Sequence, residues 1–200
     1  MDSNEWDTRY STAEYIWNAG PNQFVAAQFD GAPAAGTAID LAAGEGRNAV
    51  WLAEQGWTAT AVDFSRVALE KANHLASDRG VSIRTVVADV TSWEPAEPVD
   101  LVVIAYLQLP SKVQVSVLEH AKTWVKPGGT LFLIAHDRNN VENGYGGPPS
   151  EEVCYDLDRT VAALAGLEIE QAEVAERHVE TADGEQVALD TLVVAHAPQT

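Results

Sequence analysis

The stretch AIDLAAGEGRNAVWLAEQGW, residues 38–57, contains the residue types best suited to ligand binding. An apolar run ends at the turn GEGRN, and a helical pattern follows it. Gly44 and Gly46 allow the backbone to approach a ligand closely, and the start of a helix offers free N–H groups. The spacing also fits the loose dinucleotide pattern G-x-G-x-x-[G/A], although a tight turn with close helix packing uses glycines in the same places.

Three acidic residues accompany three successive apolar runs. Asp40 lies inside the first run, where a buried carboxylate is costly unless a donor bonds to it. Asp63 ends the second run, where an acid can accept both hydroxyls of a ribose. Asp89 ends the third run and can accept from an adenine amino group. Each alone fits a helix cap or a loop carboxylate, but together they favour an adenosine-containing cofactor.

Apolar runs alternate with amphipathic stretches from residue 36 onward, which predicts a parallel sheet with helices on both faces. Helices are expected near 47–56, 66–79 and 112–125 from their three- and four-residue apolar spacing. The predicted strands are GTAIDLA, TATAVD, IRTVVAD, VDLVVIAY and GTLFLIA.

Local signals set the ends of these helices. Ser65 and Ser111 are expected to be N-caps, and KPGG at 126–129 is expected to close the third helix. After Gly147-Pro148-Pro149 a helix is predicted around 151–165. Two alternating stretches around Asp183-Gly184 then predict a hairpin, so the sheet should end in an antiparallel pair.

Composition narrows the possible partners. The 200 residues are 46% apolar, which suits one globular domain. A net charge of −18 and only 12 scattered Lys and Arg argue against nucleic acid. No apolar run reaches the length of a membrane span, and the N-terminus does not resemble a secretory signal, so a cytoplasmic location is expected. Cys154 is the only cysteine, which excludes an internal disulfide.

From Trp6 onward, nearly the whole chain resembles the class I S-adenosylmethionine-dependent methyltransferases. DLAAGEGRNAVWLAEQGW is similar to the first motif of that family, VDFS to its ribose-binding acid and ADV to its adenine-binding acid. VKPGGTLFLI resembles the segment that enters its fifth strand, and the final hairpin resembles the antiparallel end of its seven-stranded sheet. An NAD-binding protein would instead continue into a second mononucleotide half.

The resemblance implies an α/β fold, a Rossmann-like three-layer αβα sandwich whose mostly parallel seven-stranded sheet ends in an antiparallel hairpin. It implies one methyltransferase domain over residues 1–200. Within it, 1–34 would form an N-terminal helical cap, 35–136 the cofactor-binding core, and 137–200 a lid loop, a helix and the terminal hairpin.

The resemblance also implies a set of cofactor-binding residues. Arg47 is the candidate partner of the cofactor's carboxylate, because guanidinium and carboxylate pair bidentately. Trp6 and its neighbours resemble an N-terminal segment that folds over the cofactor. The expected contacts are Arg9, Tyr10, Asp40, Ala42, Gly44, Gly46, Arg47, Asn48, Asp63, Phe64, Ser65, Asp89, Val90 and Ala105.

Within the family, the chain is most similar to small-molecule enzymes of the tellurite-resistance and thiopurine methyltransferase kind. His178 stands six residues before Gly184, as does a histidine assigned to methyl transfer in the tellurite enzymes. Such a residue can take a proton from the acceptor or hold it in line; the alternative is a half-exposed strand histidine. The accompanying arginines correspond to Val179 and Gln186 here, which counts against an oxyanion such as tellurite.

AHDRNN, directly after the fifth predicted strand, places His136 and Arg138 at the expected crevice. His136 is a second catalytic candidate, with a structural polar role as its alternative. Catechol-type methyltransferases hold a metal here, but they also need an acid where this chain has Tyr106, so no metal is predicted. The loop ENGYGGPPSEEVCY suits a lid. The expected substrate contacts are Tyr106, Arg138 and Tyr145.

The predicted activity is S-adenosylmethionine-dependent methyl transfer to a small O, N, S or Se/Te nucleophile by in-line displacement. S-Adenosylhomocysteine would be the product, and the protein would act as a monomer or homodimer. A protein that binds S-adenosylmethionine without catalysis is the alternative. An NAD(P)-dependent oxidoreductase is a further one, and it rests on GEGRNA alone.

Overall fold

The structure is a computed structural model that describes residues 3–11, 15, 20–31 and 36–199. Seven strands in these residues form a sheet in the order β3-β2-β1-β4-β5-β7-β6. The chain divides into two compact units, Met1–Ala105 and Tyr106–Thr200. Strands within the first unit pair in parallel and strands within the second pair antiparallel, which confirms the predicted α/β fold.

The first unit is built on parallel strands. β1 (Thr37–Leu41) pairs with β2 (Thr58–Asp63) on one side and with β4 (Val99–Ala105) on the other. β3 (Arg84–Val87) pairs with the outer side of β2. Four of the five residues of β1 are buried, as expected for a strand that is covered on both faces. Asp40 and Asp63 lie at the carboxyl ends of β1 and β2, and Asp89 follows the end of β3.

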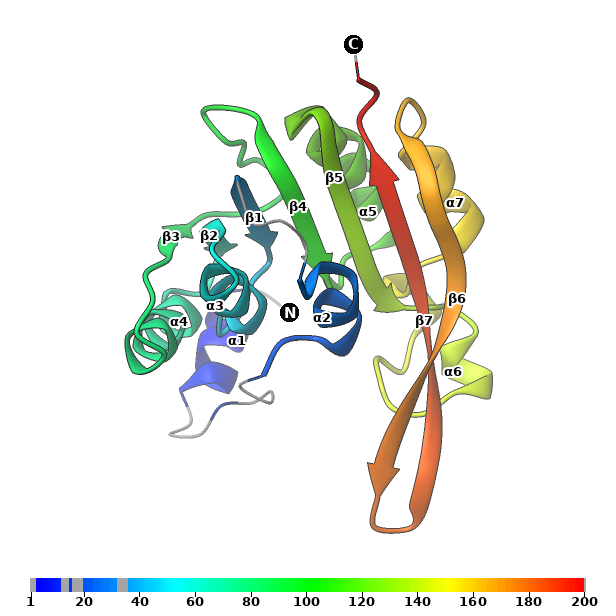
Figure 1. Cartoon of the computed structure of the whole chain (residues 1–200). Coiled ribbons are helices and arrows are strands. Elements are labelled where there is room, and N and C mark those ends of the chain that lie inside the picture. Colours follow the sequence, from blue (N-terminus) through cyan, green and yellow to red (C-terminus); the bar gives the residue numbers. More distant parts are fainter. Residues whose placement is uncertain (1–2, 12–14, 16–19, 32–35, 200) are drawn as a thin grey trace. The chain divides into compact units, whose positions relative to one another are not determined.

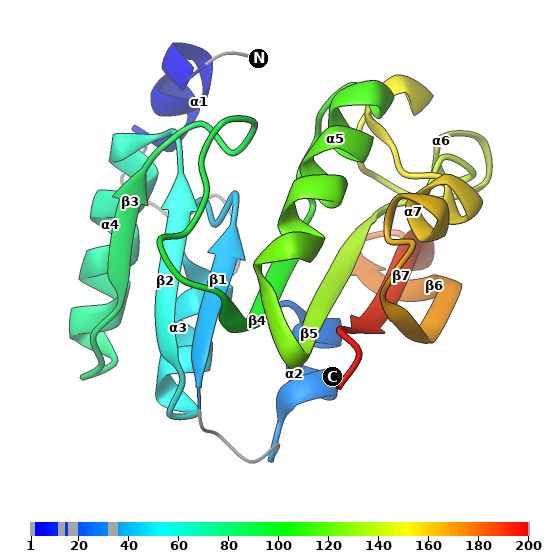
Figure 2. The ribbon, with the colours of Figure 1, turned by 90° about the horizontal axis from the view of Figure 1, so that it is seen from above.

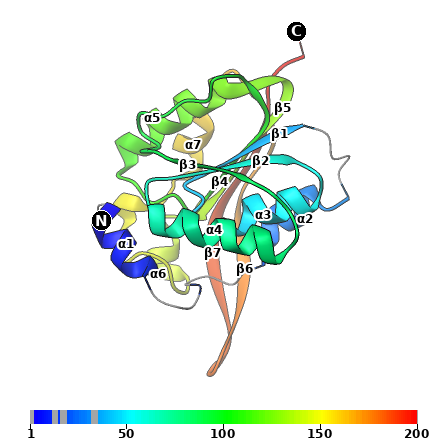
Figure 3. The same cartoon turned by 90° about the vertical axis from the view of Figure 1, so that its left-hand side faces the viewer.

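Helices α1 (Ser3–Tyr10), α2 (Gln23–Phe29), α3 (Arg47–Glu54) and α4 (Arg66–Asp78) complete the described part of this unit. Ser65 caps α4 as predicted, since its hydroxyl accepts a 3.1 Å hydrogen bond from the Ala68 N–H. Figure 3 shows α3 and α4 side by side. They pack so closely that a Cβ on Gly46 would lie only 2.4 Å from Ala72 Cβ.

The second unit is built on antiparallel strands. β7 (Gly184–His196) lies between β5 (Val125–His136) and β6 (Glu168–Thr181). Thr181 pairs with Gly184, which confirms the predicted hairpin. β5 pairs with β7 only over Asp190–His196, so the β6–β7 ribbon continues past the end of β5 (Figure 1).

Two helices of the second unit, α5 (Ser111–Ala121) and α7 (Leu157–Ala163), lie side by side in Figure 2. Shorter helical segments accompany them. These are η1 (Lys122–Trp124), α6 (Asn140–Asn143) and η2 (Glu151–Val153). No helix in the described residues is long and apolar enough to cross a membrane.

Three local predictions in this unit were wrong. Ser111 does not cap α5, because Pro110 is the N-cap and the Ser111 hydroxyl instead donates to the carbonyl of Glu152 at 3.1 Å. KPGG belongs to the start of β5, since the chain leaves the helix earlier through η1. The helix predicted around 151–165 is interrupted, because the Asp156 side chain accepts a hydrogen bond from the Arg159 N–H and starts a separate helix, α7.

Candidate functional site

Asp63 ties together two turns of the first unit. Its Oδ2 accepts a 2.8 Å hydrogen bond from the Gly44 N–H, and its Oδ1 accepts one of the same length from the Ser65 N–H. Burial raises the pKa of Asp63 even though these hydrogen bonds oppose the change. A carboxylate oxygen can accept more than one hydrogen bond. Asp63 is therefore a fixed acceptor at the end of β2 with capacity for hydroxyl donors.

Asp40 has a buried oxygen without a partner. Its side chain is only 1% exposed; Oδ2 accepts from the Ala49 N–H at 3.1 Å, whereas Oδ1 has no hydrogen bond within the described residues. Burial raises the pKa of Asp40 to about 7, and the positive charge of Arg47 opposes this rise. Orphaned buried polar atoms are rare in folded proteins, so Oδ1 marks a place where a ligand could donate.

The turn after β1 contains three residues in the left-handed region. Ala42, Gly44 and Gly46 have φ values of 59°, 54° and 76°. A Cβ on Gly44 would lie 2.9 Å from the Tyr10 hydroxyl, so α1 approaches this turn. Gly46 instead provides the space for α4, as in the packing interpretation of the glycine pattern. An alanine in this conformation stores backbone strain, which is typical of functional turns.

The N-terminal segments contact the same region. Tyr10 is buried and stacks on Trp6 with a 5.3 Å centroid separation, while the exposed Arg9 lies over the Trp6 ring. Asn48 is buried, and its Oδ1 accepts from the Asn22 N–H at 2.9 Å, which joins α3 to the start of α2.

Asp7 is a residue that the sequence did not reveal. Its carboxylate accepts from the Ser65 hydroxyl, and its charge contributes to the raised pKa of Asp63. No motif singles it out, because the contact depends on how α1 meets α4.

The remaining predicted cofactor contacts lie at strand ends of the first unit. Asp89 is exposed, and its Oδ1 already accepts from the N–H and hydroxyl of Thr91 at 2.8 and 2.7 Å. It therefore stabilises its own loop, in agreement with the loop alternative. Val90 is buried, while Phe64 and Ala105 are half-buried at the ends of β2 and β4.

The second unit holds a cluster around Asp190, whose side chain is fully buried. Its Oδ2 accepts from the Tyr106 hydroxyl at 2.8 Å and from Arg177 Nε at 2.7 Å. Its Oδ1 lies 3.2 Å from His136 Nδ1, and both atoms are buried without a hydrogen bond of ordinary geometry within the described residues. Burial alone would raise the pKa of Asp190, but its contacts with His136, Arg177 and Tyr106 hold it below the ordinary value.

Tyr106 has a strained backbone, and its ring packs against two other residues of this cluster. Its φ of 55° lies in the left-handed region, which a bulky residue rarely adopts. Its ring centroid is 4.8 Å from that of His136, and the Arg177 guanidinium lies over its face at 5.6 Å. Sequence reasoning had named Tyr106 and His136 but missed Arg177 and Asp190. Asp190 stands in an apolar strand, the same signal that singled out Asp40.

His178 and Arg138 lie outside this cluster. His178 follows Arg177 on β6, and successive strand residues point to opposite faces. Its side chain is 58% exposed, and its Nδ1 lies 2.8 Å from Glu185 Oε1. Arg138 is exposed and engaged in ion pairs with Glu151 at 3.1 Å and Asp156 at 3.2 Å.

Tyr145, in the expected lid loop, and Cys154, the single cysteine, both belong to the second unit. Tyr145 is 44% exposed, and its N–H donates to the Val187 carbonyl at 2.9 Å. Cys154 is fully buried, and burial raises the pKa of its thiol to about 11, which disfavours the nucleophilic thiolate.

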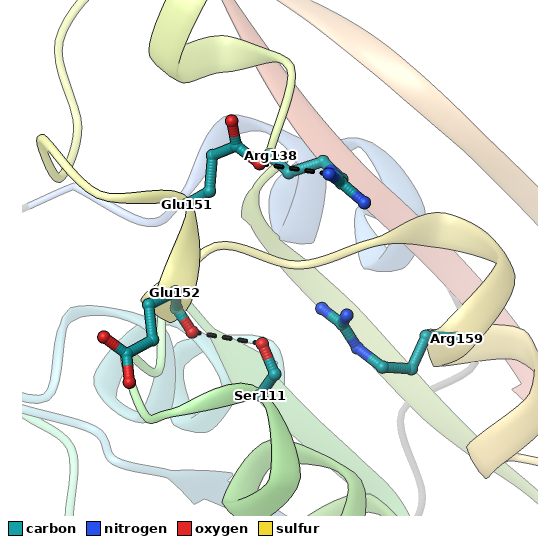
Figure 4. Close-up of a pocket in the computed structure, with 5 residues that line it drawn as sticks. All are labelled: Ser111, Arg138, Glu151, Glu152 and Arg159. Atoms are coloured by element: carbon teal, nitrogen blue, oxygen red, sulfur yellow. Dashed lines mark hydrogen bonds and ion pairs between the residues drawn. The ribbon is translucent and has the colours of Figure 1, made fainter.

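Arg138 also lines a small polar pocket of the second unit (Figure 4). The other lining residues are Ser111, Glu151, Glu152 and Arg159. None of them carries a buried polar atom without a partner, so the pocket gives a weaker ligand signal than the Asp190 cluster. The described residues contain no group of three or more potential metal ligands.

Comparison with known proteins explains the arrangement in the first unit. Residues 38–129 match the family model described as a methyltransferase domain. This segment is similar to a methyltransferase domain. This segment includes the turn after β1 and the three acids, so the resemblance read from the sequence is confirmed.

One similar protein is the ribosomal RNA small subunit methyltransferase C of Alcanivorax borkumensis, which is 32% identical over 106 residues. The match includes 50% of this chain, and the chain covers only 32% of that protein. The chain therefore spans about a third of the length of this relative.

Solved structures show the same fold. TehB from Haemophilus influenzae matches with a TM-score of 0.74 and 15% identity, over 98% of this chain and 66% of its own. The N-methyltransferase NodS from Bradyrhizobium japonicum, solved with S-adenosyl-L-homocysteine, matches with a TM-score of 0.73 and 15% identity, over 98% of both chains.

Proposed function

We propose that this methyltransferase domain transfers a methyl group from S-adenosylmethionine to a small-molecule nucleophile by in-line displacement. The observation that carries the proposal is the buried, unpartnered Asp40 Oδ1, close to Arg47, in a segment that matches a methyltransferase domain. Within the described residues, this site combines a buried carboxylate oxygen that accepts no hydrogen bond with a cation near the start of a helix.

The residues of the first unit fit the chemical groups of this cofactor. Asp40 Oδ1 would accept from the ammonium of the methionine end, and Arg47 would pair with its carboxylate. Asp63, held by the N–H groups of Gly44 and Ser65, would accept from the ribose hydroxyls. The bound sulfonium supplies an already activated methyl group, so the chain mainly has to position the reactants. Positioning can lower a barrier by about 7–11 kcal/mol.

The charge balance supports a small-molecule acceptor rather than RNA. The relative that acts on ribosomal RNA matches only half of this chain. RNA binding depends on Lys and Arg that neutralise phosphates, whereas this chain has 12 basic against 30 acidic residues. The strained Tyr106 and the buried Asp190 cluster give the second unit polar groups suited to a small ligand.

Calorimetry with S-adenosylhomocysteine tests the cofactor assignment. We expect the wild type to bind and Asp40→Asn to bind at least about tenfold more weakly, because the ammonium loses an ionic acceptor. Glu54→Gln, at an exposed ion pair on α3, is the matched control and should bind like the wild type. Absence of binding by the folded wild type would refute the proposal.

Methylation assays test the acceptor class. Labelled S-adenosylmethionine is incubated with phenols, heterocyclic amines, thiols, selenite, tellurite and a short RNA. Transfer to one of the small molecules is expected. Transfer to the RNA alone would replace the small-molecule proposal by a nucleic-acid one, and cofactor binding without any transfer would favour the non-catalytic alternative.

A further inference from the structure

His136 and Asp190 face each other in a way that gives the histidine a defined chemical role. Asp190 uses Oδ2 for the Tyr106 hydroxyl and for Arg177 Nε. Oδ1 is thereby left for His136, whose Nδ1 lies 3.2 Å away. Both facing atoms are buried and make no hydrogen bond of ordinary geometry within the described residues, so their 3.2 Å approach is the contact that each of them has. The pair is thus isolated from competing donors and acceptors.

The surroundings keep Asp190 ionised. Although burial opposes the charged form, the contacts with His136, Arg177 and Tyr106 hold the pKa of Asp190 below its ordinary value. An ionised carboxylate beside one ring nitrogen fixes the proton on that nitrogen. His136 then carries its proton on Nδ1, and the lone pair is on Nε2.

His136 Nε2 is the side of the ring that can meet a ligand. The His136 side chain is 14% exposed, and within the described residues its only polar contact is the one at Nδ1. Among the described residues, Nε2 has no hydrogen bond, yet it is not one of the fully buried polar atoms. It therefore contributes to the exposed part of the ring. A neutral imidazole with its lone pair at an accessible Nε2 is a general base.

We propose that His136, oriented by Asp190, removes the proton of an acceptor O–H or N–H group during methyl transfer. This inference rests on the proposed methyltransferase function and specifies its substrate class, a nucleophile that must lose a proton. Phenolic or enolic hydroxyls and heterocyclic N–H groups belong to this class. Selenite and tellurite do not, because their central atom attacks through an existing lone pair.

The step balances without a further reactant. The acceptor oxygen or nitrogen forms a bond to the methyl carbon, and the bond between that carbon and the sulfonium sulfur breaks. The sulfur keeps the electron pair and becomes a neutral thioether. The acceptor proton moves to His136 Nε2, and Asp190 stabilises the resulting imidazolium, as a buried carboxylate does in other histidine bases.

The groups around His136 determine how the step depends on pH. Asp190 on β7 faces Nδ1, Tyr106 packs against the ring, and Arg177 on β6 acts through Asp190. Gly147, which follows α6, approaches the His136 ring and carries no charge. Asp190 is the acid in this set and the one that favours imidazolium formation.

Nuclear magnetic resonance of the isotope-labelled, cofactor-free protein tests the orientation. At mildly alkaline pH, where imidazole is neutral, nitrogen–hydrogen couplings distinguish the two tautomers. We expect the His136 proton on Nδ1 in the wild type and in Tyr106→Phe, which alters only the Oδ2 side. Asp190→Asn should abolish this preference. Exposed His74 provides the internal reference. A His136 proton on Nε2 in the wild type would overturn the proposal.

Single-turnover methylation tests the base, with phenol, ethanethiol and selenite as probes. His136→Gln should lower the rate with phenol by about 10²- to 10⁴-fold. The loss should shrink as pH rises, because the probe then ionises without help. His120→Gln, at an exposed site on α5, is the matched control and should leave the rate unchanged.

These results separate the inference from the proposed function. Equal rates for wild type and His136→Gln, or transfer only to selenite or to the thiolate of ethanethiol, would refute the base. Failure to bind S-adenosylhomocysteine would refute the methyltransferase proposal instead. The tautomer measurement needs neither cofactor nor acceptor, so it decides the orientation of His136 in every case.

Discussion

The N–H of Gly44 donates a 2.8 Å hydrogen bond to Oδ2 of Asp63, so the acid at the end of β2 holds the turn that follows β1. The same carboxylate accepts from the Ser65 N–H at the start of α4. The glycine turn and the proposed ribose-binding acid therefore behave as one unit. Changes at either residue should affect both stability and cofactor affinity.

Asp63→Ala should weaken binding of S-adenosylhomocysteine by about 10- to 100-fold, because each hydrogen bond to a charged group contributes about 1.5–3 kcal/mol. It should also lower the melting temperature, since Gly44 and Ser65 lose their acceptor. Calorimetry and thermal unfolding measure the two effects. Asp89→Ala is the comparison, and a larger loss of affinity in that exposed variant would place the main anchor at Asp89.

Gly46→Ala should destabilise the protein by about 2–4 kcal/mol, through strain at positive φ and overpacking against Ala72. Ala72→Gly alone should cost about 1 kcal/mol, because glycine weakens a helix interior. The double variant should lose less stability than the sum of the two single losses, because without the Ala72 Cβ the clash disappears. Urea unfolding of the four proteins measures this coupling, and strict additivity would contradict the contact.

Asp40 should make stability depend on pH in an unusual direction. Its folded pKa is raised to about 7, above the ordinary value, so the fold prefers the protonated carboxyl. Its contribution to stability is complete below the unfolded value, and it is lost as pH rises to about 7. Compared with Asp40→Asn, the cofactor-free wild type should therefore lose stability over this range, by at most about 1.4 kcal/mol per pH unit.

Cofactor affinity should follow the opposite trend at the same residue. The ammonium of S-adenosylhomocysteine binds ionised Asp40, so the wild-type affinity should increase as pH rises through about 7. The affinity of Asp40→Asn should change little over the same interval. Calorimetry on both sides of this value measures the difference between the two proteins. Parallel pH profiles would show that Asp40 does not contact the ligand.

Arg177→Ala should destabilise the protein by about 2–3 kcal/mol, because the buried Asp190 carboxylate loses its cation while Tyr106 and His136 remain. The pKa of Asp190 is held low, so its stabilising effect is present above its unfolded value and is lost as pH falls through the folded one. The variant should lose stability at a higher pH than the wild type.

Two matched variants make this prediction specific to the Arg177–Asp190 pair. Arg138→Ala breaks ion pairs that are exposed to solvent and should leave the unfolding free energy unchanged. Asp190→Asn in the Arg177→Ala background should restore part of the lost stability, because it removes the unpaired charge. If the exposed and buried arginines gave equal losses, the burial argument would be wrong.

Much of the fold could be predicted because its signals are local. The strands of the first unit are continuous apolar runs, Ser65 caps α4, and the alternating stretches around Asp183-Gly184 form the hairpin. Ser111 and KPGG were misinterpreted because a local signal does not fix the structure on both sides of it. A serine or glycine pair signals a break in the chain, but whether helix or strand adjoins it depends on packing elsewhere.

Some features of the candidate site could be predicted from the sequence, and others depend on residues in distant elements. The turn at Gly44 and the acids at Asp40 and Asp63 could be named from the sequence, because each lies within, at the end of or directly after an apolar run. The roles of Asn48 and Gly46 in joining helices could not be deduced, since they depend on Asn22 and Ala72 in other elements.

The sequence by itself determined the strand–turn–helix order, the glycine turn and the acids of the first unit, because these depend on the periodicity of neighbouring residues. Only the tertiary structure decided the partners of Asp190. Tyr106 bonds to it across 84 positions of the chain, and the register of β7 between β5 and β6 brings His136 and Arg177 to the same carboxylate. Strand register is a property of the folded sheet, so no local pattern could have identified His136, rather than His178, as the histidine beside a buried acid.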